Sequence, residues 1–197
     1  MSVALYHDYL EKHKRRQNRG ALGKDSEQSK CYKAEWAVDR ICKDKIKKIE
    51  SIEEAEKIKK RILKSKTWEK VCLESGRMSS KKFVSVSAKK KNSGRGFAGM
   101  AYQDGTIVLD LKTGLNYFTL CHELAHVAGN PHHGRTFRNA NIALVSRFIG
   151  RDVAKELKAQ YRKQKLHIGN ARKPLTYEQW MDKRERALEM LHEKKGY

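Results

Sequence analysis

The sequence predicts an α+β fold in which helices pack with a small antiparallel sheet. The chain of 197 residues contains only two prolines, and 34% of its residues are charged, which is typical of a helix-rich soluble protein. Apolar residues recur at helical spacing up to residue 62, alternate after residue 83 and return to helical spacing after residue 116. This length is sufficient for one domain with a substantial core and modest extensions.

Three segments follow from the order of these patterns. Residues 1–24 are predicted to be a mobile basic arm, residues 25–166 the folded domain and residues 167–197 a C-terminal extension. Thr176 begins a terminal helix in the extension, and we expect this helix to reach about His192.

Two helices open the domain. Asp25 or Ser26 can cap a helix running to about Ile49, and Ser51 with Glu54 matches a capping box for a second helix. The buried stripe of the second helix is predicted to contain Ile52, Ala55, Ile58 and Ile62.

Three short strands are predicted next, at residues 83–87, 96–102 and 106–109. Residues 103–105 (sequence QDG) should turn the second strand into the third as a hairpin. Residues 92–96 are predicted to be a flexible hairpin tip, because they are too short and wrongly placed for a phosphate-binding loop.

The helix after the sheet carries the chemically distinctive motif. Asn116 is its predicted N-cap, and residues 129–131 (sequence GNP) end it. Because positions i and i+4 share one face of a helix, His122 and His126 can reach one metal ion. Glu123 lies between them and can act on a water at that ion.

Two helices are expected to close the domain. Residues 137–148 have helical period and end at Gly150, and Asp152 should cap a further helix through Tyr161. Phe137 is predicted to be a core anchor that fixes His133.

The four cysteines, Cys31, Cys42, Cys72 and Cys121, include no C-x-x-C pair, which favours reduced thiols in a cytosol. Cys121 adjoins His122, but core packing is the expected role for its side chain. The chain has no apolar run of membrane-spanning length and no apolar signal region, so we expect a cytoplasmic protein with no membrane partner.

A formal net charge of +21 predicts attraction to nucleic acid or another polyanion, although a well-solvated surface would have the same composition. Residues 40–91 contain 18 lysines and arginines and seven acidic residues, a net charge of +11. Half of the excess charge therefore lies on the scaffold, which suits a docking face beside an active site.

Residues 133–137 (sequence HGRTF), after the HELAH motif of residues 122–126, resemble the small zincins of the SprT, Spartan and WLM type. From about residue 25 to residue 166, the chain is similar to small metallohydrolases of actinobacteria and their phages. Residues 25–35, 105–109 and 144–150 and the His-Glu helix carry this similarity. The resemblance implies a zincin-like domain and a hydrolase. It would also place a phage-encoded protein in the host cytoplasm, and it gives no substrate.

Two adjacent histidines can supply a third ligand. His132 fits a metzincin spacing, but the methionine turn of that group is absent, whereas His133 lies four residues before Phe137 as in the SprT-like pattern. We therefore predict Zn²⁺ bound by His122, His126 and His133, with Glu123 catalysing hydrolysis of a protein or peptide substrate. The alternatives are a nucleic-acid-binding protein with a structural zinc, closed by His132, and a zinc hydrolase of non-peptide bonds.

Overall fold

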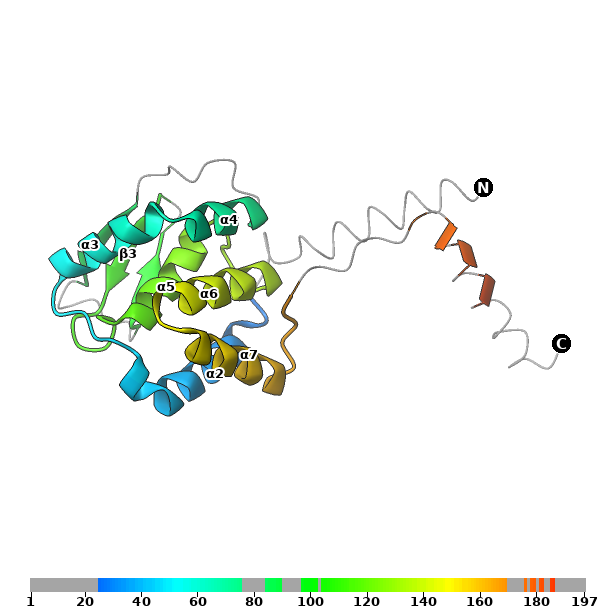
Figure 1. Ribbon diagram of the computed structural model, residues 1–197, viewed down its shortest axis with the longest axis horizontal. Helices are drawn as coiled ribbons and strands as arrows, with labels where there is room; N and C mark the ends of the chain where they lie inside the picture. The colour runs from blue at the N-terminus through cyan, green and yellow to red at the C-terminus, as the bar shows by residue number, and fades with distance from the viewer. Residues whose placement is uncertain are drawn as a thin grey trace. The chain divides into compact units, whose positions relative to one another are not determined.

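The computed structural model describes residues 25–75, 84–89, 97–102 and 104–169, together with residues 176, 178–179, 181–182 and 185–186. Contacts divide the chain into two compact units, Gly23–Gly169 and Met1–Leu22 with Asn170–Tyr197. The described part of the first unit has six α-helices and three strands (Figure 1). The basic arm predicted at residues 1–24 and the hairpin tip predicted at residues 92–96 lie outside the described residues.

The first described helix, α2, spans Gln28–Ile41 and is shorter than predicted. A 3-10 turn, η1 (Lys43–Lys45), follows it, and the chain is extended at Ile46. The prediction of a helix to Ile49 was wrong because Ile49 N–H bonds to the carbonyl of Leu115 at 2.9 Å, in place of a helical partner. The proposed caps were also wrong, since Glu27 occupies the N-cap position without a side-chain bond.

The second predicted helix is confirmed as α3 (Ile52–Leu63). The Ser51 hydroxyl accepts a bond from Glu54 N–H at 3.2 Å, and the Glu54 carboxylate accepts one from Glu50 N–H at 2.7 Å. A further helix that was not predicted, α4 (Lys66–Glu74), begins after the Ser65 cap. Its buried side chains are Trp68, Val71 and Cys72.

The sheet has the order β1 (Ser85–Ala88), β3 (Thr106–Leu109) and β2 (Gly99–Ala101). Strands β2 and β3 form the predicted antiparallel hairpin, but β1 runs parallel to β3, so the prediction of an antiparallel sheet was wrong. Because β2 occupies one edge of β3, β1 adds at the other edge. Helix α3 holds β1 at that edge by two bonds. Lys59 donates to the carbonyl of Val84, and Glu56 accepts from Val86 N–H.

Three helices complete the unit: α5 (Tyr117–Val127), α6 (Arg135–Phe148) and α7 (Arg151–Lys163). Helix α5 packs between the sheet and α6, and α7 packs on both α6 and α2 (Figure 1). The Asn116 cap is confirmed, since its side-chain oxygen accepts a bond from Thr119 N–H at 2.8 Å. The prediction for Asp152 was wrong, because Gly150 is the N-cap of α7 and Asp152 lies in the first turn.

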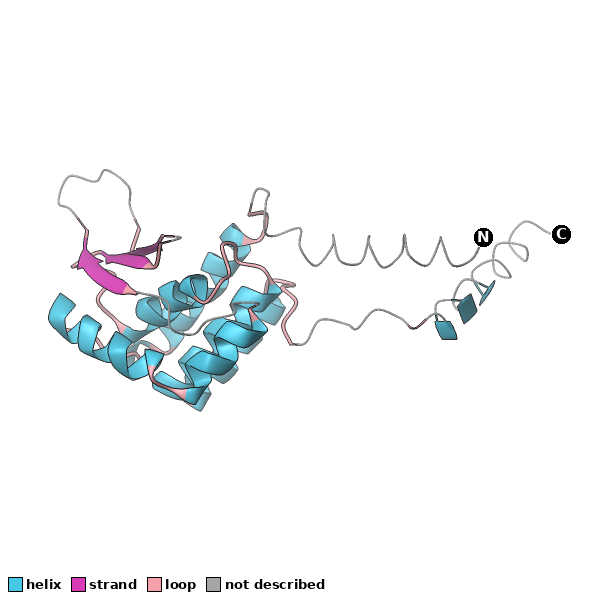
Figure 2. Cartoon of the chain, turned by 90° about the horizontal axis from the view of Figure 1, so that it is seen from above, coloured by secondary structure: helices cyan, strands magenta, loops and turns pink. Residues whose placement is uncertain are grey.

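The view from above separates the strands from the helices that pack against them (Figure 2). Helix α5 contacts β2 and β3 on one side and α6 on the other, and α7 follows beyond α6. The cysteines of the described unit are all free and buried, so the core role predicted for Cys121 is confirmed. None of the helices in the described residues is long and apolar enough to cross a membrane.

In the second unit, the structure describes part of the predicted terminal helix. Residues 178–179, 181–182 and 185–186 are helical. The Thr176 hydroxyl accepts a bond from Gln179 N–H at 3.3 Å, and the Gln179 side chain accepts one from Thr176 N–H at 3.2 Å. This reciprocal capping box explains why the helix begins where the sequence predicts.

Candidate metal centre

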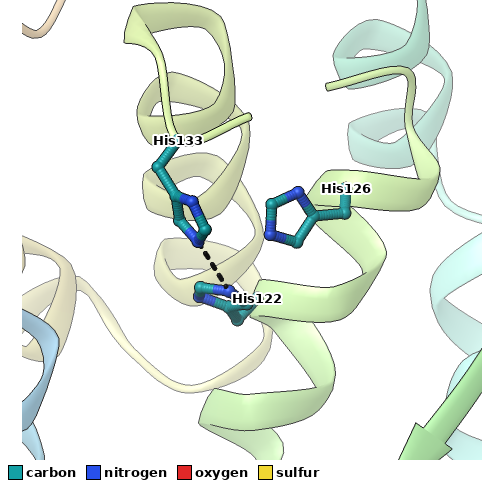
Figure 3. Close-up of side chains that lie close together, drawn as sticks. All are labelled: His122, His126 and His133. Carbon is teal, nitrogen blue, oxygen red and sulfur yellow. Dashed lines mark hydrogen bonds between the residues drawn. The ribbon is translucent and has the colours of Figure 1, made fainter. Parts of the chain in front are cut away.

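Three imidazoles converge between the end of α5 and the start of α6. One ligand atom from each of His122, His126 and His133 lies within 4.8 Å of the other two, a group that could hold a metal ion. The rings face one another in the close-up (Figure 3), and the two Nε2 atoms of His122 and His133 are 3.3 Å apart.

Helix α5 positions the first two histidines by its own geometry. His122 and His126 are one turn apart, and their ring centroids are 4.9 Å apart. After the helix, Gly129 has a φ of 115°, a left-handed conformation that glycine adopts without steric cost. This turn redirects the chain toward the site and brings residues 132–133 back to the open side of α5.

Of the two adjacent histidines, His133 is the one that the structure brings to the other ligands. Its side chain is 3% exposed, whereas the side chain of His132 is 25% exposed and is not a member of the group. The Asp25 carboxylate oxygen lies 2.6 Å from Nδ1 of His133 and 3.9 Å from Nδ1 of His132, so the closer contact fixes the inner ring.

Each imidazole is oriented by an oxygen atom at its Nδ1 nitrogen. The acceptor is the Glu35 carboxylate for His122 at 2.8 Å, the Asn130 carbonyl for His126 at 2.7 Å and the Asp25 carboxylate for His133 at 2.6 Å. In a neutral ring, a hydrogen on Nδ1 would leave the Nε2 nitrogen free to bind a metal ion. Histidine ligands of metals typically have such partners, so the residues present fit a metal ion.

The oxygen partner of His122 belongs to a buried polar network. The Glu35 carboxylate accepts bonds from the Tyr161 hydroxyl at 2.6 Å and from the Asn141 amide at 3.0 Å. The Cys31 thiol lies 3.4 Å from the same oxygen. These groups come from α2, α6 and α7, so three helices fix the carboxylate behind the metal site.

The oxygen partner of His133 is fixed by a second set of contacts. Asp25 also accepts a bond from His133 N–H at 2.9 Å, so one carboxylate holds both the backbone and the ring. The buried Arg138 side chain donates to the carbonyl of His133 at 2.6 Å, to the Glu27 carboxylate at 2.9 Å and to the carbonyl of His167 at 2.8 Å. Arg138 therefore joins the two ends of the described domain to the third histidine.

The charges of the site follow from burial and from these pairs. Burial lowers the pKa of His122, but the adjacent Glu35 carboxylate outweighs it and raises the pKa to about 9. Burial and the neighbouring imidazoles lower the pKa of His126 to about 3, and the pKa of His133 is also lowered, mainly by burial. Two of the three imidazoles are therefore neutral near pH 7, the form that binds metal ions.

Glu123 is held between α5 and the edge strand β2. The Ala101 N–H bonds to its carboxylate, and burial raises its pKa to about 7 although nearby His122 opposes the shift. A Cβ atom at Gly99 would lie 2.6 Å from Oε1 of Glu123. The backbone of β2 thus approaches this carboxyl as closely as a glycine allows.

Aromatic rings surround the imidazoles. Phe137 is fully buried, and its ring centroid lies 4.4 to 4.9 Å from those of all three histidines, so it packs on the whole group and not on His133 alone. On the other side, the Tyr32 ring meets the His133 ring edge-on at 4.9 Å.

Three positioning residues were missed by the sequence analysis: Glu35, Asn130 and Arg138; Asp25 was noted only as a helix cap. Glu35 had a local signal, because it shares the apolar stripe of α2 with Cys31, Ala34 and Val38, and a carboxylate there needs a buried partner. No protein-family model matches the chain, and comparisons with curated proteins and with solved structures give no match either.

Proposed function

We propose that the protein is a zinc-dependent peptidase whose ligands are His122, His126 and His133. The observation that carries this proposal is the convergence of three imidazoles, two buried and that of His126 half-buried, each with its Nδ1 held by an oxygen, beside a buried glutamate that is not one of the three. Three protein ligands that leave one position open are the arrangement of catalytic zinc sites.

In this proposal the chain's own groups divide the work of hydrolysis. Zinc would supply Lewis acidity and make water acidic enough to lose a proton near neutral pH. The Glu123 carboxylate accepts that proton and passes it to the nitrogen of the leaving amine. Glu35, Asp25 and the Asn130 carbonyl hold the imidazoles in one orientation while the carbonyl carbon is attacked.

The edge strand β2 gives this site a place for an extended peptide. Tyr102 N–H bonds to the carbonyl of Thr106, and Asp110 N–H bonds to that of Ala98, so the even-numbered residues pair with β3. The backbone groups of Gly99 and Ala101 therefore face away from β3, toward the side where Ala101 contacts Glu123. A substrate strand added at this edge would run beside the base.

The rival function is a structural zinc site in a nucleic-acid-binding protein. Such a site is closed by a fourth protein ligand, and His132 was the predicted residue for it. In the part of the chain that the structure describes, the ligand group contains three residues and His132 is not among them. The catalytic proposal also gives the buried Glu123 a role, which the structural one does not.

A Glu123→Gln variant tests the proposal. Glutamine keeps the shape and can still accept the Ala101 bond, but it cannot take a proton. We expect zinc binding close to that of the parent protein and a loss of peptide hydrolysis of about 100-fold or more. Glu69→Gln, an exposed change on α4, is the matched control. Normal hydrolysis by Glu123→Gln, or purified protein that does not take up zinc, would contradict the proposal.

A further inference from the structure

A second candidate site lies at the other end of α6. A cavity of about 460 Å³ is lined by Arg61, Ser65, Arg147 and Phe148. Arg147 lies near the C-terminal end of α6, whereas His133 precedes its first turn. At 1.5 Å per residue, the twelve residues from Arg135 to Arg147 separate the two ends by about 18 Å.

The cavity has the charge and hydrogen-bond donors that bind a phosphate. Arg61 and Arg147 come from different helices and are both exposed, and neither forms an ion pair with a carboxylate among the described residues. The Arg61 guanidinium is held by one bond, from Nη2 to the Tyr117 hydroxyl at 3.2 Å, which leaves its other donors for a ligand. A guanidinium matches the oxygens of a phosphate in geometry and charge.

The surroundings of the cavity extend the positive charge. Tyr117 N–H bonds to the carbonyl of Lys47 at 3.1 Å, and Lys48 forms an isolated antiparallel β-bridge with Asn116. The exposed Lys47 and Lys48 therefore adjoin Tyr117, the residue that holds Arg61. Ser65, in the cavity wall, is the N-cap of α4, whose first turn adds the positive end of a helix dipole. These features reinforce the two arginines and would not form a site without them.

The size and the aromatic wall indicate more than a free phosphate ion. A volume of about 460 Å³ is within the range of small-ligand sites and exceeds what one phosphate needs. The half-buried Phe148 lines the cavity and packs against the core, and it offers an aromatic surface on which a base can stack. A stacked base is available in a single strand and not in an intact duplex.

We propose that this cavity binds one nucleotide of a single-stranded nucleic acid, with the phosphate between Arg61 and Arg147 and the base against Phe148. The inference concerns a partner and does not depend on the hydrolytic role proposed for the metal site. It gives the net charge of +21 a defined point of contact.

The test is fluorescence anisotropy of a labelled oligothymidine of about 12 nucleotides with the full chain, over a series of salt concentrations. Arg61→Gln and Arg147→Gln should each weaken binding about tenfold. Each should also reduce the slope of log affinity against log salt by about one. Phe148→Leu, which keeps apolar volume, should weaken binding about fivefold and leave the slope unchanged.

Arg162→Gln, an exposed arginine on α7, is the matched control and should bind like the parent chain. Parent-like binding by both arginine variants would overturn the proposal. So would a duplex of the same length that binds as tightly as the single strand while Phe148→Leu has no effect. Zinc content measured on every variant should stay unchanged, which separates this proposal from that for the metal site.

Discussion

The two candidate ligands on α5 and the third candidate before α6 are positioned in different ways. His122 and His126 lie four residues apart on helix α5. The start of this helix is fixed by its N-cap, Asn116, whose side chain accepts a bond from Thr119 N–H three residues later. His133 has no regular element of its own and is held by Asp25, 108 residues earlier in the chain. The local pair is set by helix geometry, whereas the third ligand depends on tertiary structure.

This difference predicts which parts of the site are sensitive to distant changes. A helix keeps its i and i+4 side chains on one face wherever it is placed. The His133 loop keeps its position only while Asp25 and Arg138 hold its backbone and ring. Asp25 lies at one end of the described domain, and Arg138 contacts Glu27 and His167 near the two ends. Assembly of the third ligand is therefore coupled to folding of the whole unit.

The largest effect is expected from removing the third ligand itself. His133→Ala should lower zinc affinity by more than about 100-fold, because even an outer partner of a metal ligand is worth 10- to 100-fold. Peptide hydrolysis should be lost with it. The measurement is competitive zinc titration of purified protein.

His132→Ala is the matched control for that variant, since it removes the neighbouring imidazole. We expect zinc affinity and hydrolysis near those of the parent chain, because His132 lies outside the ligand group. If His132→Ala lost zinc and His133→Ala kept it, the ligand assignment would be reversed.

The next prediction concerns Gly99, in the strand β2 that packs against Glu123 of helix α5. In Gly99→Ala, the new Cβ would lie 2.6 Å from Oε1 and 2.8 Å from Cγ of Glu123, so the carboxyl must move. A displacement near 1 Å can reduce turnover on the order of 100-fold. Zinc affinity should stay unchanged, because His122 and His126 keep their helical positions.

Gly134→Ala provides the comparison for Gly99→Ala, since a Cβ there meets no atom within 4 Å. Turnover and zinc content of both variants can be measured in one assay series. Full activity in Gly99→Ala would show that the Glu123 carboxyl tolerates displacement and would remove β2 from the description of the site.

The carboxylates behind the ligands should have the next largest effect. Asp25→Asn and Glu35→Gln each keep an oxygen for the imidazole but remove the negative charge. Zinc affinity should fall about 10- to 100-fold in each. Glu35→Gln should also keep the fold, because the buried Asn141 oxygen has no partner among the described residues and its amide can turn to accept from the new Gln side chain.

The local stability of the His133 loop should differ between the two carboxylate variants, because, of the two carboxylates, only Asp25 contacts this loop. Asp25→Asn weakens contacts to the backbone and ring of the His133 loop, so zinc-free protein should lose stability near residues 132–134. Hydrogen exchange of those amides is the measurement, and Glu35→Gln should leave them unchanged. Equal protection in both variants would mean that Arg138 alone holds the loop.

The accuracy of the sequence predictions follows the same division. Elements defined by neighbouring residues were predicted closely: the Asn116 and Ser51 caps, the β3 strand and the i, i+4 histidines all depend on contacts within a few positions. The errors lie where distant segments decide the outcome. The chain at Ile49 pairs with Leu115 and so leaves its helix, and β1 adds to β3 in parallel because α3 holds it there.

The choice between His132 and His133 was predicted from motif spacing, and the structure places His133 in the ligand group. The oxygen partners were not predicted, because only Glu35 carried a local signal. Asp25 was assigned to a helix cap, since nothing in its neighbourhood indicates a partner 108 residues away. Arg138 was not considered, because one arginine among 44 basic residues is not distinguished by composition.

The smallest predicted effect concerns the outer end of the His122 network. Tyr161→Phe removes the hydroxyl that donates to Glu35 at 2.6 Å, while the Asn141 amide still donates to the same oxygen. A hydrogen bond to a buried charge contributes about 1.5–3 kcal/mol, so the free energy of unfolding should fall by that amount in urea titrations. Zinc affinity should fall less than in Glu35→Gln, because the carboxylate itself remains against His122.

Tyr102→Phe, at a residue 49% exposed, is the control and should change neither quantity. If Tyr161→Phe weakened zinc binding as much as Glu35→Gln, the orientation of His122 would depend on the whole three-helix network. His122 would then be positioned by distant residues, as His133 is, and not by its own helix.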